Sequence, residues 1–132
     1  MSNKDLYGNR SRVKELNPTH FQRLKNGKLV VTPALNKKSF VVFYASWCGH
    51  CKNMVQSYIE LANQLKGCVD GGTVFIGAFN CANNSSPGYT QIAKLCGVSS
   101  YPTIKYIKPD GMLIRYEGGR EPADFINFLR KH

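Results

Sequence analysis

Two cysteines, Cys48 and Cys51, are separated by two residues in this sequence. An apolar run at residues 40–45 precedes them and apolar residues at helical spacing follow, so the pair lies where a strand gives way to a helix. Sulfurs at positions i and i+3 of a first helical turn share one face, close enough to form a disulfide. The unpaired N–H groups at a helix start also favour the thiolate form of Cys48. The pattern therefore predicts thiol–disulfide exchange, in which Cys48 attacks a disulfide and Cys51 resolves the mixed disulfide.

His50 lies between the two cysteines and is a candidate stabiliser of the Cys48 thiolate, because a protonated imidazole adds positive charge beside it. Stabilising the thiolate stabilises the reduced protein, which makes the oxidised pair a stronger oxidant. Couples of this class span roughly −270 to −120 mV, and the histidine argues against the reducing end of that range.

A Cys-x-x-Cys pair is also half of a zinc site, which needs a second pair of cysteine or histidine ligands. Cys68, Cys81 and Cys96 stand singly and His20 lies far away in sequence, so we favour redox chemistry and expect no metal and no organic cofactor. Five cysteines are an odd number, which does not suit a disulfide scaffold. We expect Cys81 and Cys96 to be buried free thiols, whereas Cys68 is a candidate for exposure.

The composition is that of one ordinary globular domain. The chain has 132 residues, of which 42% are hydrophobic and 20% charged. It contains no apolar run of about 18 residues, the length needed to span a membrane. The net charge of +10 fits either a solvated basic face or attraction to acidic partners. Basic residues are spread along the whole chain without a nucleic-acid-binding motif, so nucleic acid is the less favoured partner.

Hydrophobic spacing and turn residues predict a single α/β domain on a mixed sheet, at residues 13–132, after a polar leader at residues 1–12. A helix is expected to begin at Asn17 and Pro18 and to end at Asn26 and Gly27. The other expected strands are at 28–32, 40–45, 73–80, 103–107 and 113–117. One expected helix has apolar residues from Met54 to Leu65 and ends at Gly67, a second runs through Tyr89 to Leu95 and ends at Gly97, and a final helix follows residues 118–119. The turn at residues 108–111, Lys-Pro-Asp-Gly, makes the last two strands an antiparallel hairpin.

The ends of the sequence bear on location. Residues 1–12 lack the apolar core of a secretory signal, and the last residues, Arg-Lys-His, are not an ER-retention signal. The expectation is a cytoplasmic protein by default. The ER lumen or a virion is the alternative, if a signal has been removed or the source is viral.

Three segments resemble parts of one known family. Residues 43–52, Phe-Tyr-Ala-Ser-Trp-Cys-Gly-His-Cys-Lys, are similar to the active-site segment of the catalytic, a-type domains of protein disulfide isomerase, which belong to the thioredoxin superfamily. Residues 101–105, Tyr-Pro-Thr-Ile-Lys, resemble its cis-proline segment, and residues 118–121, Gly-Gly-Arg-Glu, resemble the loop before its last helix. The resemblance covers residues 13–132 and implies a thioredoxin fold, with a mixed central sheet flanked by helices on both faces.

The resemblance also implies roles for individual residues. Cys48 is the exposed nucleophile, Cys51 is the buried resolving thiol, and the two form the redox-active disulfide. Arg120 matches an arginine that swings toward the resolving cysteine and lowers its pKa, although an ordinary loop arginine is nearly as good an interpretation.

The implied substrate site consists of Trp47, Gly49, Tyr101 and Pro102. The bond before Pro102 is expected to be cis, and the backbone of Tyr101 is expected to pair with an extended substrate segment. The implied partners are protein or peptide thiols and disulfides, with a small thiol such as glutathione as a further candidate, and the chain is expected to be a monomer.

The sequence departs from the family at a buried ion pair. The family has a buried acid six residues before the first active-site cysteine, where this chain has Val42, and a lysine on the next strand, where this chain has Ala78. Replacing both charges by apolar residues need not harm the fold. It leaves Cys51 in a dry apolar setting, so we expect a raised pKa and slow escape from mixed disulfides unless Arg120, a water molecule or His50 assists.

The sequence supports two functions of different classes. The first is an oxidoreductase that oxidises, reduces or isomerises protein disulfides, with His50 favouring isomerase or oxidase work. The second is a chaperone-like module that binds extended peptides beside Pro102 with weak redox activity, which the loss of the buried ion pair keeps open.

Overall fold

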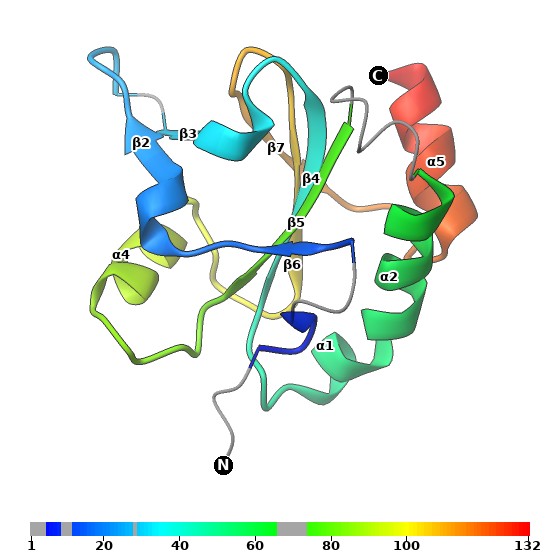
Figure 1. Cartoon of the computed structure of the whole chain (residues 1–132), viewed down its shortest axis with the longest axis horizontal. Coiled ribbons are helices and arrows are strands. Elements are labelled where there is room, and N and C mark those ends of the chain that lie inside the picture. The colour runs from blue at the N-terminus through cyan, green and yellow to red at the C-terminus, as the bar shows by residue number, and fades with distance from the viewer. Residues whose placement is uncertain (1–4, 9–11, 28, 66–73) are drawn as a thin grey trace.

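The structure is a computed structural model that describes residues 5–8, 12–27, 29–65 and 74–132. Its centre is a five-stranded mixed sheet in the order β1-β5-β4-β6-β7 (Figure 1). The strands are β1 (Lys14–Glu15), β4 (Lys38–Tyr44), β5 (Val74–Asn80), β6 (Thr103–Ile107) and β7 (Leu113–Tyr116). β5 runs parallel to both β1 and β4, whereas β6 is antiparallel to both β4 and β7. The predicted mixed sheet with an antiparallel hairpin at one edge is therefore confirmed.

Helices cover both faces of this sheet, as expected. On one side lie α1 (Gly49–Asn53), α2 (Val55–Gln64) and α5 (Pro122–Lys131), and on the other lies α4 (Gly88–Leu95) beside a small hairpin of β2 (Phe21–Arg23) and β3 (Leu29–Val31) (Figure 1). Among the described residues, no helix combines the length and apolar character needed to cross a membrane.

Strand β4 is buried on both faces because helices pack on each side of it. Its residues Phe40, Val42 and Tyr44 face the core shared with α2 and α5, whereas Val41 and Phe43 face the core shared with α4. This explains why the sequence shows an unbroken apolar run there rather than an alternating one. Cys48 and Cys51 follow the end of this buried strand after a short connection at residues 45–47.

The expected helix at residues 17–27 is wrong beyond its first turn. The side chain of Asn17 caps a single 3₁₀ turn, Pro18–His20, after which the chain turns into strand β2. The ring of Phe21 packs edge-on against Phe79, with ring centroids 5.1 Å apart, and Leu24 lies 38% exposed rather than on an inner face. Pairing with β3 and burial of one aromatic ring thus outweigh the helix-starting signal.

Part of the polar leader expected at residues 1–12 packs against the domain. Tyr7 is only 5% exposed, and its ring makes edge-on contacts with Tyr44 and Tyr58 at centroid distances of 5.6 and 5.5 Å. The backbone amide of Leu6 donates a hydrogen bond to the Tyr44 hydroxyl at 2.9 Å. Tyr7 is therefore part of the core, and Leu6 packs against it.

The predicted turn between the last two strands is confirmed. The amide of Gly111 donates to the carbonyl of Lys108 at 2.8 Å, and Gly111 has a φ of +91° that favours glycine. Gly97, which follows α4, also has a positive φ, of +72°. The expected end of α2 at Gly67, the start of a strand at Thr73 and the exposure of Cys68 fall outside the described residues.

Candidate active site

Cys48 and Cys51 lie at the start of α1, directly after strand β4. Cys48 is the residue that precedes the first turn, and its carbonyl accepts the amide of Lys52 at 3.0 Å. Cys48 is partly exposed, whereas Cys51 is 1% exposed and packs in the core with Tyr58. Both are free thiols in this structure. The helix thus presents one sulfur to solvent and holds the other behind it.

The two thiols differ sharply in acidity. Burial raises the pKa of Cys48, but the amides of Cys51 and His50, the Cys51 thiol and the Arg120 guanidinium outweigh it, so its pKa lies below the ordinary value. Burial raises the pKa of the Cys51 thiol to about 12, and the neighbouring Cys48 adds to the rise while Arg120 opposes it. The raised pKa that the sequence predicted for Cys51 is therefore confirmed. A reactive thiolate beside a protonated thiol is the arrangement that disulfide exchange requires.

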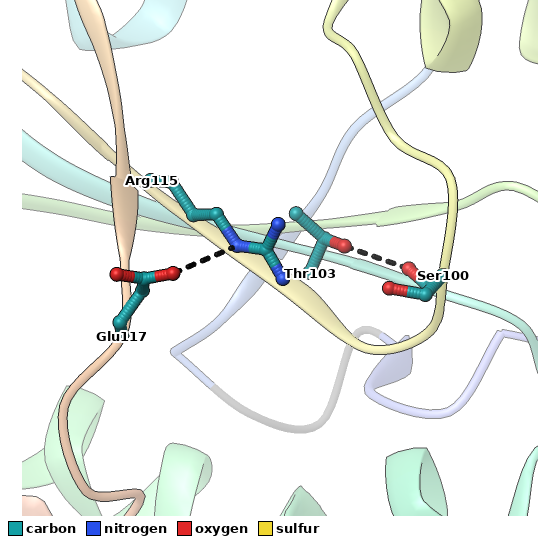
Figure 2. A network of polar contacts seen from close by, with 4 residues as sticks. All are labelled: Ser100, Thr103, Arg115 and Glu117. Carbon is teal, nitrogen blue, oxygen red and sulfur yellow. Dashed lines mark hydrogen bonds and ion pairs between the residues drawn. The ribbon is translucent and has the colours of Figure 1, made fainter.

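The loop before β6 faces the exposed sulfur. The bond between Tyr101 and Pro102 is cis, as the resemblance implies, and the carbonyl oxygen of Tyr101 lies 3.8 Å from the Cys48 sulfur. The hydroxyl of Thr103 donates to the carbonyl of Ser100 at 2.7 Å, which closes the backbone around this bond (Figure 2). These contacts bring residues more than fifty positions apart to one site.

Other residues of the predicted substrate site surround Cys48. The indole of Trp47 is 49% exposed and lies edge-on to Tyr101, with ring centroids 6.0 Å apart. Gly49 is exposed, and a Cβ atom there would meet nothing within 4 Å, so this position is open to an approaching chain. His50 is also exposed at the start of the helix. The rim of the site is therefore partly aromatic and open.

A shallow cleft beside the cis bond contains two arginines. Pro102, Thr103, Arg115, Glu117 and Arg120 are among the residues that line it. Figure 2 shows the contact between the Arg115 Nε atom and the Glu117 carboxylate, which are 3.7 Å apart. Arg120 acts instead on both cysteines, which brings this predicted pKa modulator into the electrostatic range of the site.

The apolar replacement of the family's ion pair is seen directly. Val42 on β4 and Ala78 on β5 lie opposite each other in the parallel pairing, and both are fully buried. They belong to the same core as Cys51. No carboxylate therefore lies at the position from which the family's acid serves the resolving thiol.

Sequence reasoning missed a partly buried acid on the neighbouring strand, one of whose carboxylate oxygens is fully buried. Glu15 on β1 pairs with Ala78 across the sheet, so Glu15, Ala78 and Val42 form one row on the same face. Its carboxylate accepts hydrogen bonds from the Tyr44 hydroxyl at 2.5 Å and from the Tyr7 amide at 3.1 Å. The only sequence signal was the acid's place two residues after the buried Val13, on a strand too short to be recognised.

The remaining described cysteines lie on the other side of the sheet. Cys81 and Cys96 are buried and free, as predicted, in the core that α4 shares with the sheet. Burial raises the pKa of each to about 12. Both are therefore protonated and poorly reactive at neutral pH.

Comparisons with known proteins agree with this geometry. A family model described as Thioredoxin matches residues 13–131. Protein disulfide isomerase-like 2-2 of Oryza sativa subsp. japonica is 40% identical over 98 residues, which cover 73% of this chain and 24% of that protein. Protein disulfide-isomerase of Oryctolagus cuniculus is 34% identical over 110 residues, covering 82% and 20%. The chain thus spans no more than a quarter of the length of these relatives.

Solved structures share the fold. A crystal structure of ERdj5, form II, superposes with a TM-score of 0.75 at 20% identity, over 99% of this chain and 15% of that one. The first thioredoxin domain of mouse Protein disulfide-isomerase A4 gives a TM-score of 0.60 at 27% identity, over 84% and 78%. Because the Thioredoxin model matches residues 13–131 and the curated relatives are protein disulfide isomerases, this chain belongs to the thioredoxin family and is a domain of the protein disulfide isomerase type.

Proposed function

We propose that this chain is a thiol–disulfide oxidoreductase that exchanges disulfides with protein or peptide substrates through the Cys48–Cys51 pair. The observation that carries the proposal is the contrast between the two thiols: a partly exposed Cys48 with a lowered pKa and a buried Cys51 with a pKa of about 12. In the reducing direction, Cys48 attacks a substrate disulfide and Cys51 releases the product. In the oxidising direction, the protein disulfide accepts a substrate thiolate.

Protein substrates are favoured by the shape and chemistry of the rim. The exposed indole of Trp47 beside Tyr101 offers apolar contact area, and the Tyr101 backbone lies within reach of Cys48. An extended segment that pairs with this backbone is recognised through main-chain atoms, largely independently of its sequence. We propose further that the exchange serves isomerisation or oxidation, because His50 lies beside Cys48 and favours the thiolate.

The test is the reduction of insulin by dithiothreitol, followed as the appearance of turbidity, with and without the protein. We expect acceleration by the natural protein and none by Cys48→Ser, because that variant lacks the nucleophile. Recovery of activity from a scrambled, disulfide-containing enzyme then tests isomerase work. If the natural protein and Cys48→Ser both behave as the protein-free control, exchange is excluded and only the peptide-binding function is left.

A further inference from the structure

Glu15 is a partly buried ionisable group that takes no part in the exchange between Cys48 and Cys51 proposed above. Its Oε2 atom accepts the hydrogen bonds from Tyr44 and Tyr7, but its Oε1 atom is buried and has no hydrogen-bond partner among the residues that the structure describes. Leaving a buried carboxylate oxygen unpartnered costs stability. A catalytic role is one explanation for such an atom.

Tyr7 donates its backbone amide to the Glu15 carboxylate, and its side chain lies in the same core as the resolving thiol. Its ring lies edge-on against Tyr44 and Tyr58, in the core that also contains Cys51. The negative charges of Glu15 and of an ionised Cys51 both act on the Tyr7 hydroxyl and raise its pKa, in addition to the larger effect of burial. The hydroxyl is therefore within electrostatic range of both groups.

The resolving step needs a group that accepts a proton. With a pKa of about 12, Cys51 is a neutral thiol at neutral pH and must lose its proton as it attacks. Arg120, which also acts on Cys51, is a cation with no acceptor site. The acceptor must therefore come from elsewhere in the core or from solvent.

We propose that Glu15 accepts the Cys51 proton, with Tyr7 in the path, when Cys51 attacks the mixed disulfide. In that step the bond between the sulfurs of Cys51 and Cys48 forms and the bond between Cys48 and the substrate sulfur breaks. The substrate sulfur leaves with the electron pair and is protonated by solvent, while the Cys51 proton moves to Glu15. Glu15 acts on the Cys51 proton through Tyr7, so it is a positioning residue rather than a catalytic residue. This inference rests on the proposed exchange function.

The surroundings of Glu15 suit this task. The described titratable groups that interact electrostatically with it are Asp5 and Tyr7 from the N-terminal segment, Tyr44 from β4, Tyr58 from α2 and Tyr89 from α4. Burial raises the pKa of Glu15 to about 7, with a smaller rise from Asp5, against the lowering effect of its hydrogen bonds. A base that is about half ionised at neutral pH can both take and return a proton.

The test separates the two chemical steps. The reduced protein, in a Cys68→Ser background, is mixed with an aromatic disulfide that releases one coloured thiolate when Cys48 attacks and a second when Cys51 closes the protein disulfide. A Cys51→Ser variant assigns the second release, because it lacks that phase. Glu15→Gln keeps the size and hydrogen-bonding oxygen of the side chain but cannot take the proton. Glu60→Gln makes the same chemical change at an exposed position on α2 and is the matched control.

We expect the second release in the natural protein to rise with pH and level off with a midpoint near 7. In Glu15→Gln it should be at least about tenfold slower at pH 8, the lower end of a general-base effect, and should rise tenfold per pH unit without levelling. The first release should be unchanged, and Glu60→Gln should match the natural protein. Tyr7→Phe, which removes only the hydroxyl, should behave as Glu15→Gln does.

Identical second-phase profiles in the natural protein and Glu15→Gln would overturn the proposal. A natural profile in Tyr7→Phe would overturn the path through its hydroxyl. If Glu15→Gln does not fold, the natural protein decides alone: a plateau with a midpoint near 7 supports the proposal, and a continuous tenfold rise per pH unit overturns it. Absence of the first release contradicts the exchange function itself, and with it this inference.

Discussion

The sulfur of Cys48 lies 3.8 Å from the carbonyl oxygen of Tyr101, on the loop that carries the cis bond to Pro102. The nucleophile therefore faces the main chain to which an extended substrate would pair. Pairing through main-chain atoms places a substrate disulfide beside Cys48 without reference to the substrate's side chains. This relationship is why the proposed exchange suits many protein substrates rather than one.

Arg120 is expected to tune the reactivity of Cys48. Its charge lowers the pKa of both thiols, so Arg120→Gln should raise both pKa values. Alkylation of Cys48 at pH 7 should then slow on the order of twofold, a small effect because the arginine is exposed. The rate is measured by site-resolved mass spectrometry at low and at high salt, and the difference should shrink at high salt. Arg115→Gln is the control, since Arg115 pairs with Glu117 in the same cleft. Equal effects of the two substitutions would contradict a specific role for Arg120.

The imidazole of His50 is expected to make the cysteine pair more oxidising. His50→Ala keeps the backbone amide that stabilises the Cys48 thiolate and removes only the ring, so the change in potential reports the ring alone. The reduction potential of the cysteine pair in the natural protein should be above roughly −270 mV, and that of the variant should be lower by up to roughly 30 mV. Equilibration with glutathione buffers measures both potentials. A potential at the reducing end, unchanged in His50→Ala, would contradict this account.

A carboxylate placed at position 42 is expected to assist Cys51 directly. Val42→Glu introduces an acid on the Cys51 side of the sheet, so turnover should rise above the pKa of that acid, most clearly in a Glu15→Gln background. Burying this acid without a partner should cost about 3 kcal/mol or more of unfolding free energy at pH 8. Adding Ala78→Lys, directly opposite in the pairing, should recover part of that cost in urea unfolding. Turnover unchanged across pH would mean that proton transfer from Cys51 does not limit the reaction.

Glu15 is expected to make the protein less stable as the pH rises. Its pKa is about 7 in the folded state against 4.5 for the free side chain, so between those values the folded state holds more protons than the unfolded state. The contribution of Glu15 to the free energy of unfolding is therefore fully present below pH 4.5 and is lost as the pH rises through 7. The total loss is about 3 kcal/mol. Urea unfolding from pH 4 to 8 should show this loss in the natural protein relative to Glu15→Gln.

The comparison of those two proteins has an internal control. Burial and the charge of Lys14 lower the pKa of His20, which makes its own contribution rise with pH, but it does so equally in both proteins and cancels in the difference. Parallel stability curves for the two proteins would show that Glu15 is ionised in the folded state at its ordinary pKa.

The parts of the fold and site that the sequence predicts are those governed by local signals. The buried strand β4 is recognisable by its apolar run, and the cysteine pair is placed by its spacing at the junction with α1. The turn at Gly111 is specified by proline and glycine within four residues. The raised pKa of Cys51 could be predicted from apolar neighbours alone, because burial is its largest cause.

The parts that could not be predicted depend on contacts between distant segments. Asn17 and Pro18 start a helical turn, but the path of the chain after that turn is decided by the rings that Phe21 meets on β4 and β5. Glu15 resembles an ordinary polar residue in the sequence, and only the pairing of β1 with β5 turns it toward the core. A two-residue strand has no periodicity from which this could be recognised.

The hydrogen bonds made by the amides of Leu6 and Tyr7 have a consequence for water access. These amides hold the N-terminal segment against the Tyr44 hydroxyl and the Glu15 carboxylate, although the segment is not itself a strand of the sheet. Such a segment can detach at a lower free energy than the whole sheet. Deuterium exchange at these two amides therefore reports how often solvent reaches the Glu15 carboxylate. The same measurement indicates how long a proton on Glu15 is kept from exchange with bulk solvent.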